Sequence, residues 1–300
     1  MHGLMDWLPA MPPAPLLFAQ LVIGLINGAF YAMLSLGLAI IFGMLNIINF
    51  AHGAFYMLGA FAAWLLANFL GIGYWPSLVL VPLIVGVVGV VVERLILRHT
   101  YGLDPLYGLL LTFGMALIIE GIFRQIYGVS GQSYDIPDAL QGVQSLGFMY
   151  LPIYRAWVIG AALVLCFVTW FAIERTRLGA YLRAATENPV LVRAFGINVP
   201  RLITLTYGFG VALAALAGVM AAPVYQVSPL MGSNEIIVVF AVVVIGGMGS
   251  IMGAIVSGFL LGVIEGLTKV FYPPASSTVI FVIMALVLLV KPAGLFGKAN

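Results

Sequence analysis

Long apolar runs recur along the whole chain, and they constrain its fold more than any other feature. Several are at least as long as the roughly 20 residues that an α-helix needs to cross a bilayer; residues 16–44, 76–97 and 152–173 are examples. A soluble domain is about one quarter charged, whereas only 7% of these residues are charged. The runs are continuous and lack the alternation of transmembrane β-strands. The sequence therefore predicts an all-α, polytopic integral membrane protein.

We expect about eight or nine transmembrane helices in one domain covering residues 1–300. The N-terminal spans occupy 16–173, a polar segment occupies 174–201, and the C-terminal spans occupy 202–297. The N-terminal tail has no basic region before an apolar core, so it does not read as a cleavable signal peptide. The net charge of +2 is too small to indicate a nucleic-acid partner.

Two apolar segments are interrupted by polar or glycine-rich sequence, FGMLNIINFAHG at 42–53 and VIGGMGSIMGA at 244–254. One interpretation is an ordinary turn between helices. The other is a broken or re-entrant helix, which a membrane tolerates only where protein or a water-filled path covers the backbone. The candidate path or gate residues are Asn46, Asn49, His52, Gly246, Gly247 and Gly249.

The polar segment 174–201 carries five of the twelve basic residues, whereas the polar loop 128–150 contains Asp135 and Asp138 and no Lys or Arg. Cytoplasmic loops of membrane proteins are enriched in Lys and Arg. The segment 174–201 is therefore expected in the cytoplasm and the loop 128–150 outside. Counting spans then places the C-terminus in the cytoplasm.

Within that polar segment the sequence predicts a helix over 178–187, a sharp turn and a second short helix. Asn188 is a suitable N-cap, Pro189 a suitable first helical residue, and Gly196 a suitable residue after the helix. An apolar ridge is expected on the short helix, formed by Val190, Leu191 and Phe195. A solvated loop is the alternative, but such a ridge suits a groove on a partner protein.

Charged residues near the ends of spans are expected to be structural. Glu120 and Arg124, and likewise Glu265 and Lys269, have the i,i+4 spacing of ion pairs on one helix face. Glu93, beside Arg94, is interpreted as part of an interfacial anchor at the end of its span.

Several catalytic patterns are missing from the sequence. It contains no G-x-x-x-x-G-K-[ST] phosphate-binding loop and no H-E-x-x-H motif, and its single cysteine, Cys166, excludes an intrachain disulfide. We therefore expect no catalytic residues, no metal ligands and no cofactor bound by this chain. Three classes stay open on the residues alone: a permease driven by separate ATPases, an ion-coupled secondary transporter, and a structural membrane subunit.

The segment ENPVLVRAFGINVPRLITLTYGFGVALAALAGVMAAP, starting at Glu187, closely resembles LivH-type permeases of branched-chain amino-acid ABC importers. The resemblance continues in INFAHGAFYMLGAF, VVERLILR, AVVVIGGMGSIMGAIVSGFLLGVIE and LVLLVKPAGLFG, in the same order and spacing. One departure is the Lys291–Pro292 pair, where the family is often purely apolar before its proline.

This resemblance implies a multi-pass subunit of the bacterial inner membrane that is not an enzyme. Its partners would be a second, LivM-type permease, two cytoplasmic ATPase subunits that hold ATP and Mg²⁺, and a periplasmic substrate-binding protein. The cargo would be leucine, isoleucine and valine, although close relatives carry urea or short amides. The resemblance places a coupling helix within 184–196. The residues expected to couple to the ATPases are Arg183, Glu187, Asn188, Pro189, Arg193 and Gly196.

Overall fold

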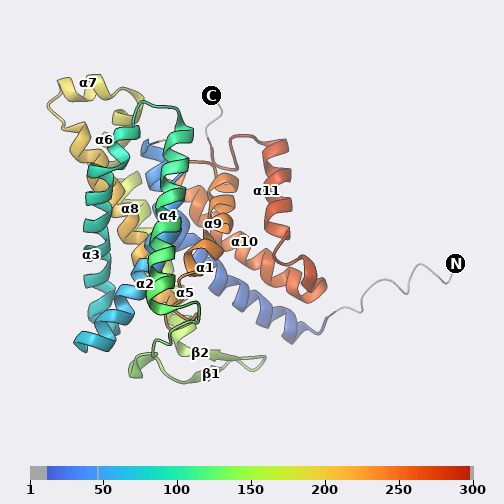
Figure 1. The fold of residues 1–300 in the computed structure, drawn as a ribbon. Coiled ribbons are helices and arrows are strands. Elements are labelled where there is room, and N and C mark those ends of the chain that lie inside the picture. The colour runs from blue at the N-terminus through green and yellow to red at the C-terminus, as the bar shows by residue number, and fades with distance from the viewer. Residues whose placement is uncertain (1–11, 46, 298–300) are drawn as a thin grey trace.

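The computed structural model describes residues 12–45 and 47–297, so the candidate path residue Asn46 lies outside the described residues. The chain folds almost entirely into helices, with one short β-hairpin (Figure 1). The elements in chain order are α1 (Ala14–Leu45), α2 (Ala51–Leu70), α3 (Tyr74–Leu95), η1 (Leu97–Thr100), α4 (Pro105–Tyr127), η2 (Asp138–Leu140), β1 (Val143–Ser145), β2 (Tyr150–Pro152), α5 (Ile153–Glu174), α6 (Arg177–Glu187), α7 (Pro189–Ala194), α8 (Val199–Ala221), α9 (Met231–Gly246), α10 (Ile251–Phe271), η3 (Pro273–Ala275) and α11 (Val279–Val290).

The helices are those of a multi-pass membrane protein. In the described part of the chain, seven helices are long and apolar enough to cross a bilayer: α1 to α5, α8 and α10. The apolar helices α9 and α11 are shorter. The expected polytopic all-α fold is confirmed, with two of the apolar segments forming shortened helices.

The polar segments lie at two opposite ends of the molecule (Figure 1). Helices α6 and α7 are at one end, together with the segment that follows α11, whereas β1 and β2 are at the other. The hairpin is antiparallel, with Gln144 opposite Leu151. An isolated bridge between Gln132 and Val227 ties the loop before it to the connection between α8 and α9. The segments predicted on opposite sides of the membrane are therefore separated in the fold.

Helices α1 and α10 pack along a glycine seam that consists of Gly24, Gly28, Gly258, Gly262 and Gly266. A Cβ atom at Gly24 would lie 2.7 Å from the carbonyl oxygen of Gly262, and one at Gly266 would lie 2.6 Å from that of Gln20. Small residues four positions apart let helix backbones approach closely inside a membrane, where packing replaces the hydrophobic drive of water. The seam therefore fixes α10 against α1.

Helix α8 occupies the centre of the bundle, against α1, α2 and α3. Its Tyr207, Val211, Ala214 and Ala217 are almost completely buried. In contrast, α3, α4 and α5 expose many Leu, Ile, Val and Phe side chains. An exposed apolar helix face is the face expected to meet lipid or another membrane subunit.

Candidate functional site

The polar segment between α5 and α8 forms two helices separated by a single residue. Helix α6 ends at Glu187, and Asn188 caps α7 because its side-chain oxygen accepts a hydrogen bond of 3.0 Å from the Leu191 N–H. Pro189 is the first residue of α7, and Gly196 follows it with a φ of +81°. The predicted arrangement of helix, sharp turn and short capped helix is confirmed.

Helix α7 turns most of its apolar side chains outward. Val190, Leu191 and Phe195 are 74%, 54% and 77% exposed, whereas Val192 is 5% exposed and packs against the neighbouring helices. Exposed apolar side chains clustered at a polar end of a protein are typical of an interaction site. We call Val190, Leu191 and Phe195 the α7 ridge; Glu187 and Arg193 are exposed beside it.

Helix α6 is held to the end of α5 by its own chain. Arg183 donates to the Ile173 carbonyl oxygen at 3.2 Å and pairs with Glu174 at 3.4 Å. Both partners of this ion pair are nearly half exposed, so the pair contributes little stability. Gly179 contributes more to the position of α6, since a Cβ there would overlap the Ile173 carbonyl group. Arg183, predicted to couple to the ATPases, therefore also contacts the end of α5, while Gly179 sets how closely α6 approaches it.

The glycine-rich turn between α9 and α10 lies beneath α6. A cavity of about 90 Å³ is lined by Gly43 from α1, Leu182 and Thr186 from α6, and Gly249 from the turn. Gly247 and Gly249 have φ angles of +101° and +84°, which favour glycine. A Cβ at Gly43 would lie 3.0 Å from the Cα of Gly249. Movement of α6 therefore bears directly on this turn.

The break between α1 and α2 leads the chain back to the middle of α1. The imidazole Nε2 of His52 is 3.0 Å from the carbonyl oxygen of Leu34, which lies in the middle of α1. Leu34 precedes the end of α1 at Leu45 by eleven residues, or about 16 Å of helix. The chain therefore turns back alongside α1, and the interpretation as a broken helix stays a prediction.

Two of the candidate path residues are buried at this break. Asn49 is 1% exposed and donates to the Tyr207 hydroxyl at 3.2 Å, and His52 is 0% exposed. The Asn49 Oδ1 and the His52 Nδ1 have no hydrogen-bond partner among the described residues. Helix α1 connects this break to the glycine turn, since a Cβ at Gly37 would lie 2.8 Å from the His52 ring and one at Gly43 would lie 3.0 Å from the Cα of Gly249. The two predicted regions are thus linked along one helix without being in contact.

Thr112 of α4 is a supporting residue that sequence reasoning missed. Its hydroxyl accepts from the Phe50 N–H and lies 3.1 Å from the Ile48 carbonyl oxygen, to which it can donate. Thr112 is 0% exposed. Irregular backbone inside a membrane needs such partners. No local sequence signal connects a threonine in one span with a turn more than 60 residues earlier.

Glu93 was predicted as part of an interfacial anchor, but its side chain is 1% exposed. It accepts hydrogen bonds from Tyr101 at 2.9 Å and from Thr204 in α8 at 2.6 Å. Burial raises the pKa of Tyr101, so its hydroxyl stays protonated and donates. Glu93 thereby joins the end of α3 to the start of α8. The sequence signal that could have indicated this burial was that Glu93 has no Lys or Arg three or four positions away.

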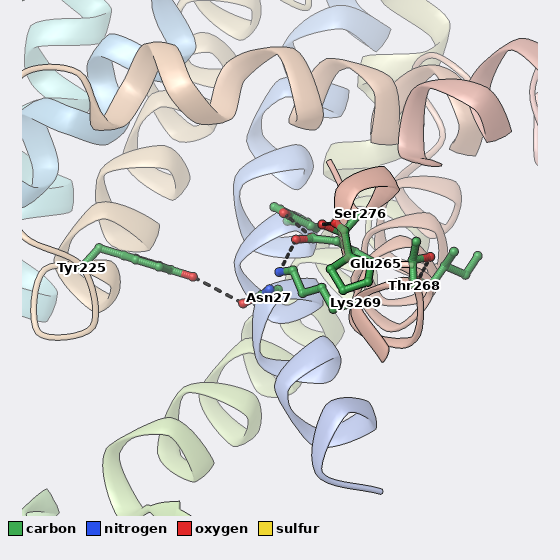
Figure 2. A network of polar contacts seen from close by, with 9 residues as sticks. Asn27, Tyr225, Glu265, Thr268, Lys269 and Ser276 are labelled. Atoms are coloured by element: carbon green, nitrogen blue, oxygen red, sulfur yellow. Dashed lines mark hydrogen bonds and ion pairs between the residues drawn. The ribbon is translucent and has the colours of Figure 1, made fainter. Parts of the chain in front are cut away.

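A second polar network surrounds Glu265 in α10 (Figure 2). Glu265 accepts from Lys269 at 2.6 Å and from the Tyr31 hydroxyl at 2.7 Å. The predicted Glu265–Lys269 pair is confirmed. Figure 2 also shows Tyr225 pointing toward Asn27, 3.5 Å away.

The predicted pair of Glu120 and Arg124 is wrong. The ion pairs among the described residues are Arg183–Glu174 and Lys269–Glu265. Glu120 lines a cavity between α2, α4 and α9. The i,i+4 spacing permits a pair but does not impose it on long, flexible side chains.

Among the described residues, no group of three or more His, Cys, Asp or Glu side chains comes together that could hold a metal ion.

Comparison with known proteins adds the family context. The family model described as "Branched-chain amino acid transport system / permease component" matches residues 20–289. The chain is 32% identical to the high-affinity branched-chain amino acid transport system permease protein BraD of Pseudomonas aeruginosa, over 93% of this chain and 95% of that protein. It is 30% identical to LivH of Salmonella typhimurium over the same shares, and 28% identical to LivM of that organism over 88% of this chain and 67% of that protein. No solved structure matches the chain.

Proposed function

The chain belongs to the permease-component family of branched-chain amino acid transport systems, and from this premise we propose its cargo, partners and mechanism. It is a multi-pass permease subunit of an ABC importer and not an enzyme. An ion-coupled carrier is not favoured. The proposed cargo is leucine, isoleucine and valine, because the relatives are named for branched-chain amino acids.

We propose that the α7 ridge docks on a cytoplasmic ATPase. The observation that carries this proposal is a six-residue helix capped by Asn188 and anchored by Val192. Together with Phe195, which directly follows it, this helix exposes three apolar side chains at the polar end of the molecule. Short amphipathic helices bind grooves through such anchors. Asn188, Pro189 and Gly196 would fix the shape of the helix, and Glu187 and Arg193 would add charged contacts beside it.

The partners in this proposal are a second, LivM-type permease, two ATPase subunits and a periplasmic binding protein. ATP and Mg²⁺ would be held by the ATPases. The location would be a bacterial inner membrane, with α6, α7 and the C-terminus in the cytoplasm. The arginines of 174–201 support this orientation.

Transmission would run from α7 into the bundle by two routes. Helix α6 borders the turn of Gly246, Gly247 and Gly249 through a shared cavity that Gly249 lines. Helix α8 begins five residues after α7 and is joined to α3 through Thr204 and Glu93. We propose that ATP-driven closure moves α7, and that the glycine turn and the break at Asn46, Asn49 and His52 gate a path between the two permeases.

The docking test uses affinity purification of the co-expressed transporter. Val190→Glu combined with Phe195→Glu should abolish co-purification of the ATPase subunits, because it charges the ridge. Val143→Glu combined with Tyr150→Glu is the matched control, since these residues are 61% and 74% exposed on the hairpin at the opposite end. Retention of the ATPases by the ridge variant would contradict the docking proposal.

The cargo test uses vesicles that contain the assembled transporter with its binding protein. ATP-dependent uptake of radiolabelled leucine, and none of urea, is the expected result. Uptake of urea or an amide without leucine would assign another cargo. Uptake of leucine on an ion gradient without ATP would contradict the coupling to ATPases.

A further inference from the structure

A small cavity between α1, α2 and the start of α9 has an unusual lining for a membrane-spanning region. Aromatic rings and one carboxylate surround it, and its residues are Phe30, Tyr31, Leu34, Tyr56, Tyr225 and Glu235. We call this set the aromatic cage. Phe30 and Tyr56 are 6% and 3% exposed, whereas Tyr225 is 40% exposed and forms the outer wall. The rings of Phe30 and Tyr225 meet edge to face, with their centroids 5.4 Å apart.

Glu235 is the unpaired acid of this region. Among the described residues its carboxylate has no ion-pair or hydrogen-bond partner, whereas nearby Glu265 is bound by both Lys269 and Tyr31. Glu235 lies in the second turn of the apolar helix α9, and an ionisable side chain without a partner in a membrane helix usually serves a function. Glu235 is therefore free to accept a cation from outside this chain.

The shape and chemistry of the cage suit an ammonium group. Aromatic ring faces attract ammonium ions through the negative charge of their π-systems. A carboxylate adds a charge-assisted hydrogen bond. The cavity volume is about 10 Å³, close to the ~10–15 Å³ that holds one water-sized group, and an –NH₃⁺ group has that size. The ammonium group of a free amine or of an amino acid fits this site, whereas urea carries no such charge.

Arg155 in α5 supplies the opposite charge nearby. Burial raises the pKa of Tyr225, as do the charges of Glu235 and Glu265, whereas the charge of Arg155 lowers it. Arg155 has no ion-pair partner in the described part of the chain. A guanidinium group recognises carboxylates. Tyr225 thus lies within the fields of Glu235, Glu265 and Arg155. Of these, Glu235 and Arg155 have no ion-pair partner among the described residues, and they carry the two signs of charge that would attract an amino-acid zwitterion.

We propose that the aromatic cage with Glu235 is a transient binding site for the α-ammonium group of the transported amino acid. This inference rests on the proposed cargo and deepens it by naming the group that the permease itself recognises. Selection for a free ammonium would then occur in the membrane, in addition to any selection by a binding protein.

The test measures ATP-driven leucine uptake by the assembled transporter at increasing concentrations of leucine-loaded binding protein. Glu235→Gln should lower the maximal rate by about tenfold, the loss expected for one charge-assisted contact. The leucine concentration for half-saturation of the binding protein should not change. Glu235→Asp should keep part of the rate, and Glu120→Gln, which also replaces an acid on a membrane helix, should transport like the wild type.

Methylammonium provides a probe of the cage itself. It should inhibit leucine uptake by the wild type without affecting leucine binding to the isolated binding protein. The residual uptake of Glu235→Gln should resist it. A Glu235→Gln transporter with wild-type rate, or one equally inhibited by methylammonium, would overturn the inference.

Two further outcomes are separable from these. If Glu235→Gln prevents assembly with the second permease, Glu235 makes a subunit contact and the inference is also overturned. If the wild type takes up no amino acid at all, the proposed cargo fails. If the wild type takes up leucine and Glu235→Gln takes it up at the same rate, the proposed cargo stands and only the inferred binding site in the aromatic cage is overturned.

Discussion

Two irregular segments interrupt the helices of this protein, and they are stabilised in opposite ways. At 188–198, Asn188 and Asn198 each accept a backbone N–H three residues later, so neighbouring side chains hold the turns. At 47–50, the stabilising groups come from distant helices, Thr112 in α4 and Tyr207 in α8. The exposed segment can fold locally and stay movable, whereas the buried break exists only when the bundle has assembled.

The strongest test of this difference is Thr112→Val, because it removes a distant partner of the buried break. This change keeps the size of the side chain but leaves the partly buried Phe50 N–H without its acceptor, at a cost of about 2 kcal/mol. We expect an earlier thermal transition, measured by reaction of a thiol dye with the buried Cys166 as the bundle opens. Thr112→Ser should restore stability, and an unchanged transition in Thr112→Val would mean that the break does not depend on α4.

Removal of the second distant partner should have a smaller effect. Tyr207→Phe deletes the hydroxyl that receives the Asn49 amide at 3.2 Å and should cost about 1–2 kcal/mol, because Asn49 stays buried. The same dye assay measures it. Asn49→Ala combined with Tyr207→Phe should destabilise by less than the sum of the single changes; additivity would show that the two groups act independently.

Loss of the Asn188 cap should cost less stability, and only within α7. Asn188→Ala removes the acceptor for the Leu191 N–H and should destabilise α7 by about 1 kcal/mol. Hydrogen exchange should become faster in 189–194 while α1 and α2 keep their protection. Asn188→Asp, which retains the cap, is the matched control, and faster exchange throughout the bundle would contradict the proposed independence of this segment.

The smallest effect is expected at the surface pair beside it. Glu174→Gln removes the ion pair with Arg183, whose side chains are 43% and 48% exposed, and should change stability by less than about 0.5 kcal/mol. A thermal scan at low and high salt would measure the difference. A larger loss would show that Arg183 positions α6 through its charge more than Gly179 does through its lack of a side chain.

This contrast also explains what the sequence could and could not predict. The helices, the capped α7 and the Glu265–Lys269 pair depend on residues close together in the chain, and they were predicted. Thr112 could not be found in this way, because it lies more than 60 residues from the break it supports. The aromatic cage likewise draws its residues from α1, α2, α9 and the connection before α9, which only the folded bundle brings together.

Errors arose where spacing was treated as contact. Glu120 and Arg124 share a helix face but form no pair, whereas Glu93 was predicted at an interface and is buried between Tyr101 and Thr204. For a charged side chain in a bundle, the packing of neighbouring helices decides exposure, and one-dimensional spacing does not contain that information.

The glycine seam between α1 and α10 has a consequence at the level of the gene. Every nonsynonymous single-base change in a glycine codon either adds a side chain or stops translation, and the backbone carbonyls at the seam leave no room for a Cβ at Gly24 or Gly266. No single-base change that replaces either glycine is therefore conservative. In a mutational scan, the seam should appear as two stripes of intolerance at every fourth codon, set in apolar sequence that otherwise accepts exchange among Leu, Ile and Val.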